Sequence, residues 1–485
     1  MLFKKNPCVI FRDYEHFGLL VSYKHFAYGS NHHMPTSDSI ISPTGSIIYK
    51  QLTDVYMSIE EISQKVATYY DDIEGDLLKH DVLEFLLQLS KCNYVIANIA
   101  PTFLTDGETQ AVAESPHRKM SINSVFEKYG LQLPRLNSVH MEIASKCNER
   151  CIHCYIPHEN KTDYIKTSLF DKILNECKTL NVLHFTITGG EPMLHPNFCD
   201  FLRELRINNF AVSVLSNLTL LSDVVVQEMK LNPLLGVQTS VYSMDEDIHD
   251  SITQVKGSLV KTLKAIELLK KNGIPIQISC PIMKQNYNSY ESVKQWGLMN
   301  NIAVNADYVI IGKYNGSTDN LKSRLSLHEI ECIYQKNNNY VSENDKSMDS
   351  YICDVGGASI CISELGLVYP CAGWQSCILG STENETIESI WYHSDQLIKL
   401  RGLKRHHING CADCPAFQFC EPCLVRNANE SYTHNPLEKS DYFCEIAKIK
   451  KEKITKQVNH YLFEEMFDDD EIYGNVTATI HSTGV

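Results

Sequence analysis

The chain has 485 residues, a formal net charge of −15 and 43% hydrophobic residues. This length allows two to four globular domains, and no apolar run is long enough to cross a membrane. The acidic balance disfavours a nucleic-acid partner. The N-terminus lacks the apolar core of a signal peptide, and 18 cysteines in such a chain favour a reducing, cytoplasmic location and metal ligation over disulfides.

The first hundred residues predict a small α+β unit in which short strands precede two helices. A capping box, Ser58-Ile-Glu-Glu61, predicts the start of the first helix. Residues 101–134 are polar and mixed, so we expect a linker there. The expected elements of the unit are strands at 8–12, 18–23, 46–49 and 94–97, a Pro-Thr-Gly turn at 43–45, and a second helix at 74–89.

Three cysteines follow a strand-like apolar run at 139–144, in the spacing C-x3-C-x2-C. They are Cys147, Cys151 and Cys154, and the aromatic Tyr155 comes next. Three thiolates on one loop can hold three corners of a cubane iron–sulfur cluster and leave the fourth iron open. An open iron can bind a substrate or cofactor, so the spacing indicates a cluster that takes part in a reaction and does not only store electrons. Structural or zinc-bound cysteines are the alternative interpretation.

A second strand-like run at 182–188 leads into Gly189-Gly190-Glu191-Pro192. Two glycines at a strand end let the backbone approach a ligand closely, and the carboxylate of Glu191 can accept from an ammonium group. Four more strands are expected. Two of them end in polar residues, Ser216-Asn217 in one and Ser240 with Tyr242 in the other, which are either ligand contacts or ordinary polar caps. These strands span 210–216, 236–242, 275–282 and 304–311, with a clear amphipathic helix at 258–272.

Six strands alternating with helices predict a parallel sheet with crossover helices. In barrel-like α/β folds the chemistry lies at the carboxyl ends of the strands. Both the cysteine loop and the Gly-Gly-Glu-Pro element fall at such ends. The last residues, 461–485, are acidic and then rich in Thr, Ser and Gly, so we expect a polar tail.

The cysteine loop, Tyr155 and the Gly-Gly-Glu-Pro element resemble those of radical S-adenosylmethionine (SAM) enzymes. The resemblance implies a partial (β/α)6 TIM-like barrel at 135–330, whose open iron chelates the amino and carboxylate groups of SAM. It also implies that Tyr155 packs near the adenine and that Gly189, Gly190, Glu191 and Pro192 meet the methionyl amine. The implied contacts to the ribose and carboxylate are Ser216, Asn217, Ser240 and Tyr242.

A further cysteine pattern at 331–460 resembles the SPASM extension, which houses two auxiliary 4Fe–4S clusters and would bring the total to three. Cys420 and Cys423 are two residues apart where the family has three, and a pair of zinc ribbons is the alternative. Cys361 is either a fourth ligand of the first auxiliary cluster or a buried apolar residue, and Cys377 is either a ligand or a free thiol. The implied ligands are Cys353, Cys371 and Cys423 for the first auxiliary cluster and Cys411, Cys414, Cys420 and Cys444 for the second.

The winged-helix-like α+β unit at 1–100 resembles the PqqD-like domain that binds leader peptides, in which a leader adds as a strand to a sheet edge. A purely stabilising domain is the alternative, and a DNA-binding winged helix is disfavoured because the helix at 74–89 is acidic.

Together the resemblances imply an α/β radical SAM maturase that cleaves SAM to a 5′-deoxyadenosyl radical and oxidatively crosslinks a ribosomally synthesised precursor peptide. A thioether is slightly favoured over a C–C or C–O bond, and flavodoxin or ferredoxin would donate electrons. The alternatives are an anaerobic sulfatase-maturing enzyme, a peptide epimerase, and an inert cluster-bearing scaffold that binds a peptide.

Overall fold

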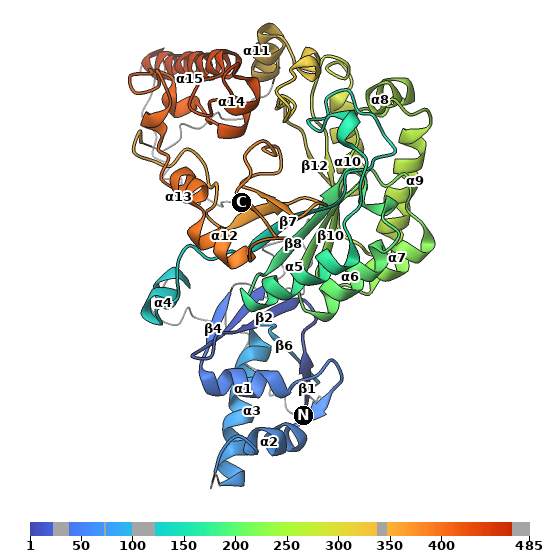
Figure 1. Cartoon of the computed structure of the whole chain (residues 1–485), viewed down its shortest axis with the longest axis vertical. Coiled ribbons are helices and arrows are strands. Elements are labelled where there is room, and N and C mark those ends of the chain that lie inside the picture. The colour runs from blue at the N-terminus through green and yellow to red at the C-terminus, as the bar shows by residue number, and fades with distance from the viewer. Residues whose placement is uncertain (23–37, 72–73, 99–121, 337–346, 468–485) are drawn as a thin grey trace.

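The computed structural model describes residues 1–22, 38–71, 74–98, 122–336 and 347–467. Figure 1 shows an N-terminal unit at one end of the long axis, and beyond it the large sheet with its helices side by side with the C-terminal third. Most of the expected linker and the tail beyond Phe467 lie outside the described residues. Among the described residues, none of the helices combines the length and apolar character needed to cross a membrane.

In its described residues, the N-terminal unit holds two antiparallel three-stranded sheets and three helices around one apolar core. The sheets have the orders β5-β1-β6 and β2-β3-β4. Its strands are β1 (Leu2–Lys5), β2 (Val9–Asp13), β3 (Gly18–Ser22), β4 (Ser39–Ile41), β5 (Met57–Ser58) and β6 (Val95–Asn98), and its helices are α1 (Pro43–Gln51), α2 (Ile59–Ala67) and α3 (Gly75–Lys91).

The capping box is confirmed, but the turn and strand expected at 43–49 are wrong. Ser58 Oγ accepts from Glu61 N at 3.2 Å, and Glu61 Oε2 accepts from Ser58 N at 2.7 Å. Residues 43–51 instead form α1, because Ser42 Oγ caps the amide of Gly45 at 3.0 Å and Pro43 occupies the first turn.

The six expected barrel strands are present and parallel, with helices outside them. The strands are β7 (Ser138–Ala144), β8 (His184–Gly189), β9 (Ala211–Leu215), β10 (Leu235–Ser240), β11 (Ile276–Ser279) and β12 (Ala303–Asn305). The helices are α5 (Thr167–Thr179), α6 (Phe198–Ile207), α7 (Asp223–Lys230), α8 (Glu246–Thr253), α9 (Ser258–Lys271) and α10 (Tyr290–Asn300), and α4 (Ile122–Lys128) lies within the expected linker.

The last barrel strand is shorter than expected. β12 ends at Asn305, whereas the sequence predicted a strand to residue 311. The side chain of Asp307 accepts from Val309 N at 2.8 Å, so a local side-chain turn replaces the strand ladder.

The C-terminal third continues the barrel sheet. β13 (Ser359–Ile362) pairs in parallel with β7, and the sheet order is β12-β11-β10-β9-β8-β7-β13-β14-β15. Ile360 and Ile362 join the main apolar core with Val139 of β7. The remaining elements are α11 (Leu327–Lys336), β14 (Leu367–Tyr369), β15 (Gly380–Ser381), α12 (Ile387–His393), α13 (Asp395–Arg401), α14 (Leu424–Glu430) and α15 (Asp441–Phe467), which extends past residue 461, where the tail was expected to begin.

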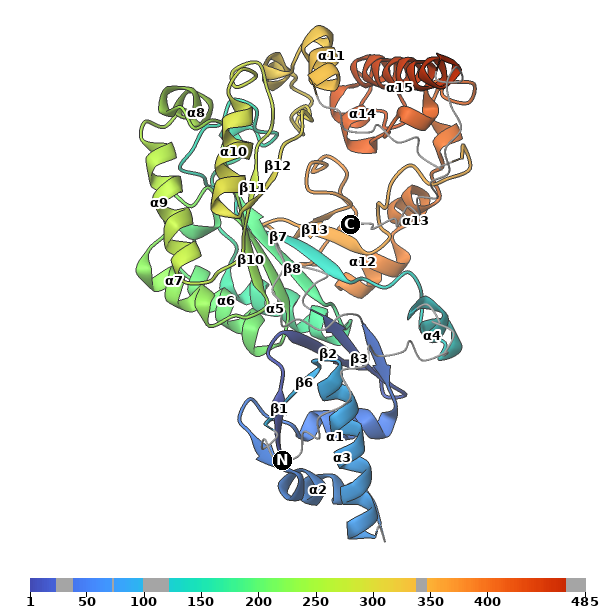
Figure 2. The same cartoon turned by 180° about the vertical axis from the view of Figure 1, so that it is seen from behind.

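The N-terminal unit packs against the amino ends of the barrel strands. Figures 1 and 2 show β2 and β3 below these ends. Asn209 accepts from Phe11 N at 2.9 Å and donates to Val9 O at 3.1 Å. The buried Arg12 donates twice to Val182 O, at 2.9 and 2.7 Å. The contact therefore combines hydrogen bonds between side chains and main chain with an apolar cluster that includes Leu19 of β3.

Candidate active site

A cavity of about 320 Å³ lies at the carboxyl ends of the barrel strands. It brings together most of the residues that the sequence singled out there, and Glu191 and Pro192 are not in its lining. The predicted residues that line it are Cys147, Cys151, Cys154, Tyr155, Gly189, Gly190, Ser216, Asn217, Ser240 and Tyr242.

Sequence reasoning missed several polar lining residues. Glu149 and His153 lie inside the cysteine loop itself, and Lys161 follows it by seven residues. Thr188, Gln238 and Ser279 come from three strands. Their positions inside the motif and near strand ends were visible in the sequence, but nothing there separated cavity residues from polar caps.

The cysteine loop is held tightly by its own backbone and side chains. Glu149 N donates to Cys147 Sγ at 3.4 Å, and Cys151 Sγ donates to Glu149 Oε2 at 3.5 Å. Burial raises the pKa of Cys147 to about 11 and that of Cys151 well above its ordinary value. A metal that binds here must therefore displace protons from the thiols.

Gly189 and Gly190 sit against the start of the cysteine loop. Gly189 has φ +133°, and a Cβ there would lie 2.0 Å from Ala144 O. A Cβ on Gly190 would lie 2.3 Å from the carbonyl oxygens of Ser145 and Lys146. Gly190 N donates to Ala144 O at 2.7 Å. The glycines therefore let two strand ends meet at backbone distance.

Glu191 lies behind the cavity and is fully buried. Its carboxylate accepts from Met193 N at 3.0 Å, from Ser216 Oγ at 2.8 Å and from Asn217 N at 2.8 Å. Burial raises the pKa of Glu191 to about 7. Three donors of the chain thus engage this carboxylate, and its contact with an ammonium group stays a prediction.

Tyr242 connects the fourth strand to the cysteine loop. Its hydroxyl donates to Cys151 Sγ at 4.0 Å and lies 3.5 Å from His153 Nε2. Asn217 follows the third barrel strand, β9, and its Nδ2 donates to Oδ1 of Asn148 in the cysteine loop at 2.9 Å. Residues from two strand ends therefore contact the same loop.

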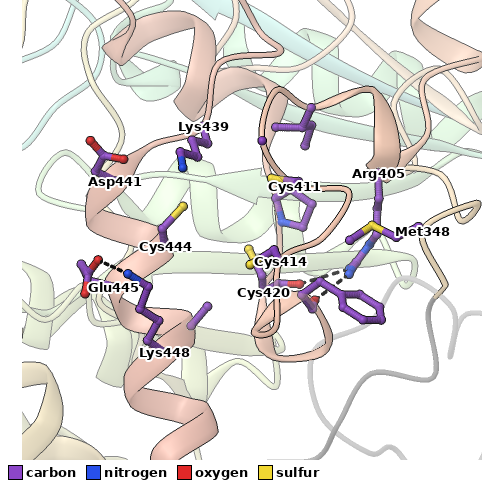
Figure 3. Close-up of a pocket in the computed structure, with 15 residues that line it drawn as sticks. Met348, Arg405, Cys411, Cys414, Cys420, Lys439, Asp441, Cys444, Glu445 and Lys448 are labelled. Atoms are coloured by element: carbon purple, nitrogen blue, oxygen red, sulfur yellow. Dashed lines mark hydrogen bonds and ion pairs between the residues drawn. The ribbon is translucent and has the colours of Figure 1, made fainter.

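A second cavity, of about 120 Å³, lies in the C-terminal third and is lined by four of the predicted ligands. Figure 3 shows Cys444 on α15 facing the loop that carries Cys411, Cys414 and Cys420. A set of four thiols around one space fits a four-cysteine iron–sulfur cluster, in which each thiolate binds a different iron atom. No three His, Cys, Asp or Glu side chains in the described ranges converge closely enough to hold a single metal ion.

Cys353, Cys371 and Cys423 influence one another electrostatically. Burial raises the pKa of Cys353, and the neighbouring Cys423 and Cys371 raise it further. Burial also raises the pKa of Cys371, with Cys423 again adding to the effect. These three cysteines, predicted to share a cluster, are therefore close in space. Their role as ligands stays a prediction.

Cys361 and Cys377 have different surroundings. Cys361 lies on β13 and is buried, and the nearby Cys371 and Glu142 add to the effect of burial in raising its pKa. Cys377 lies in the main apolar core, where Gln396 Nε2 donates to its Sγ at 3.6 Å. Cys361 is thus the one of the two that is near the predicted ligand Cys371.

Two family profiles match the chain. The radical SAM superfamily profile matches residues 141–296, and the profile of SPASM, an iron-sulfur cluster-binding domain, matches residues 353–415. The first match contains the cavity with the cysteine loop, and the second begins at Cys353.

The proteins and solved structures that are similar to the chain include the following three. The antilisterial bacteriocin subtilosin biosynthesis protein AlbA of Bacillus subtilis is 26% identical over 317 residues, which is 60% of this chain and 68% of AlbA. An AdoMet-dependent heme synthase of Methanosarcina barkeri is 23% identical over 329 residues, 60% of this chain and 92% of the synthase. Streptococcus suis SuiB bound to its precursor peptide SuiA has a TM-score of 0.56 at 15% identity, covering 92% of this chain and 100% of SuiB.

Proposed function

Because this chain belongs to the radical SAM superfamily and carries a SPASM iron–sulfur domain, we propose that it matures a ribosomally made precursor peptide by oxidative crosslinking. When bound, the clusters and SAM supply a 5′-deoxyadenosyl radical and an acceptor for the electron that crosslinking releases. The protein's part is to bind, orient and enclose the reactants.

One observation carries the proposal: the two parts of the chain that carry thiol-lined cavities share one continuous sheet. The cysteine loop follows β7, and the C-terminal third joins the same sheet through β13, directly beside β7. We propose that one substrate lies between these two parts. The names of AlbA, a bacteriocin biosynthesis protein, and of SuiB with its bound precursor peptide support a peptide as that substrate.

At the first site Cys147, Cys151 and Cys154 would hold a cluster and leave one iron for SAM. Tyr155 would pack on the adenine. Ser216, Asn217, Ser240 and Tyr242 line the cavity and would hydrogen-bond to the ribose and carboxylate. Lys161 lines the same cavity, and its ammonium group is a natural partner for the SAM carboxylate.

At the C-terminal third we propose two auxiliary clusters. Cys411, Cys414, Cys420 and Cys444 would hold one in the second cavity. Cys353, Cys371 and Cys423 would hold the other, with Cys361 as its fourth ligand or with an iron left open. An open iron would accept a substrate thiolate, so we favour a thioether slightly over a C–C or C–O bond.

The N-terminal unit would bind the leader segment by strand addition. The outer edge of β2 is engaged by Asn209 through Val9 and Phe11. We therefore place the added strand on one of the other edges, β4, β5 or β6. This unit disfavours the sulfatase-maturing alternative, because an enzyme that reads a short motif on a folding protein needs no leader-binding domain.

The test is anaerobic reconstitution with iron and sulfide, followed by dithionite, SAM and a short peptide encoded beside this chain. We expect 5′-deoxyadenosine and a peptide lighter by two hydrogens. Cys147→Ala should abolish both, whereas Cys92→Ala, an exposed cysteine outside every motif, should change neither.

The remaining outcomes separate the alternatives. Deoxyadenosine with an unchanged peptide mass would favour an epimerase. Neither product from a protein with full iron content would contradict the enzyme and favour the peptide-binding scaffold.

A further inference from the structure

Arg405 is a buried cation in the wall of the second cavity. Its side chain is 3% exposed, and it lines the cavity with Cys411, Cys414 and Cys420. None of the ion pairs found in the described part of the chain includes it. Buried charges are normally paired, because leaving water is costly for an isolated ion. Among the described residues, therefore, no carboxylate lies within ion-pair distance of Arg405.

The guanidinium of Arg405 is fixed to the loop that carries the thiols. Nη1 donates to Phe417 O at 3.0 Å, and Nη2 donates to Cys420 O at 3.2 Å. Its third donor, the Nε–H group, is buried and has no acceptor. Figure 3 shows Arg405 beside Cys420, on the side of the loop away from Cys444. A cation thus lies behind the loop that carries three of the four cysteines, and it lines the cavity with them.

Burial lowers the pKa of Arg405, and Cys420, Glu421 and Cys411 act in the opposite direction. Cys411 and Cys420 are predicted cluster ligands, and Glu421 is a carboxylate on the same loop. A cluster with its thiolates, which carries net negative charge in both oxidation states, would add a counter-charge beside Arg405.

We propose that Arg405 is a positioning residue that raises the reduction potential of the second auxiliary cluster. The inference rests on the proposed function, which places that cluster in this cavity. Reduction adds one electron, so a buried positive charge beside the cavity stabilises the reduced form of the cluster more than the oxidised form. The cluster thereby becomes a better acceptor for the electron that crosslinking releases.

Lys439 provides the matched control, because it also lines the cavity but is exposed. Solvent screens an exposed ammonium group much more than a buried guanidinium. Removing the charge of Lys439 should therefore affect the cluster far less than removing the charge of Arg405.

The experiment is a potentiometric titration, followed by electron paramagnetic resonance, of the reconstituted full-length protein. The signal of the second auxiliary cluster is identified as the one that Cys444→Ala removes. In Arg405→Gln we expect the equilibrium constant for reduction of this cluster to fall at least tenfold, which is 59 mV for a one-electron couple. Arg405→Lys keeps the charge but not the planar guanidinium group, so its equilibrium constant should lie between those of wild type and Arg405→Gln. Lys439→Gln should change the constant less than twofold.

An unchanged potential in Arg405→Gln at full iron content would overturn the inference. Loss of the signal in both Arg405 variants, with circular dichroism unchanged, would also overturn it, because Arg405 would then serve cluster assembly. If Cys444→Ala removes neither iron nor signal, the cavity holds no cluster and the proposed function fails at that point instead.

Discussion

Gln375 donates a hydrogen bond of 2.6 Å from Nε2 to Oε2 of Glu142, across 233 positions of the chain. Glu142 lies on β7, the strand that leads into the cysteine loop, and Gln375 follows the predicted ligand Cys371 by four residues. The other carboxyl oxygen of Glu142 is buried without a partner. Burial and the neighbouring Glu364 raise the pKa of Glu142 to about 8, so this carboxyl is largely protonated at neutral pH.

Removing the amide of Gln375 should lower the stability of the fold, because the buried carboxyl of Glu142 would then have no hydrogen-bond partner. We expect Gln375→Leu to lower the free energy of unfolding by about 1–3 kcal/mol. Gln335→Leu is the matched control, since Gln335 makes a similar bond of 3.2 Å to Glu331 on an exposed helix face, and should cost less than about 0.5 kcal/mol. Thermal melting of the two variants at equal iron content would measure the difference, and equal melting points would contradict the prediction.

Because Gly190 contacts the cysteine loop, we expect one added methyl group at this position to disturb the loop and the binding that depends on it. Gly190→Ala would place Cβ 2.3 Å from two loop carbonyls, so the loop must move. We expect loss of the cysteine-loop cluster and at least tenfold weaker SAM binding, measured by iron content and calorimetry. Gly402→Ala should behave as wild type, because its Cβ would meet nothing closer than 3.5 Å. Normal iron content in Gly190→Ala would show that the contact is not needed.

His184 makes the stability of the barrel depend on pH. Its ring bridges Ser138 Oγ at 2.8 Å and Ser213 Oγ at 2.9 Å across three strands. Burial, with a smaller effect of His140, lowers the pKa of His184 to about 4. The unfolded chain therefore binds a proton near pH 6.5 that the folded chain refuses until about pH 4, so stability is present above pH 6.5 and is lost as pH falls.

A shift of this size corresponds to at most about 3 kcal/mol. In His184→Gln the decline in melting temperature between pH 7.5 and 5 should be shallower than in wild type. His80→Gln, on the exposed face of α3, should keep the wild-type slope. Identical slopes in all three proteins would contradict this assignment.

Arg324 and Glu430 join the barrel to the C-terminal third in a nearly buried ion pair, with Nη1 2.9 Å from Oε2. Arg324 Nε also donates to Ile310 O at 2.9 Å. Arg324→Met would leave Glu430 charged and unpaired, at a cost of about 3–5 kcal/mol. The double variant with Glu430→Met should be less destabilised than the sum of the single variants.

Lys294→Met, which breaks an exposed pair with Glu291, is the control and should cost less than about 1 kcal/mol. We expect faster proteolysis of the C-terminal third in Arg324→Met than in the control variant. A proteolysis rate equal to that of the control would argue against a role of the pair in this joint.

Local signals in the sequence predicted local structure well. The capping box at Ser58, the helix at 258–272 and the strand before the cysteine loop depend on neighbours a few residues apart, and all three are present. Helix α1 was missed because Pro-Thr-Gly indicates a turn equally well, and burial of Tyr49 in the unit's core decided between them.

Contacts between distant segments could not be predicted in this way. The pairing of β13 with β7, the bond between Gln375 and Glu142, and the position of Arg405 against the cysteines depend on how the whole chain folds. Motif spacing identified the thiols, because cluster ligation restricts it. The side chains that surround those thiols follow no spacing rule, and so the structure was needed to find them.

The parallel pairing of β13 with β7 also fixes the distance between the cysteine loop and the segment that leads to Cys371. Cys361 stands opposite His140 in this register. A slip by one residue would move the segment that leads to Cys371 by about 3.3 Å and turn Cys361 to the opposite face of the sheet. Electron transfer between metal centres depends steeply on their separation. A single-residue insertion or deletion in β13 should therefore be far more harmful than any conservative substitution there, since it would change the distance between the two clusters that we propose for the cysteine loop and for Cys371.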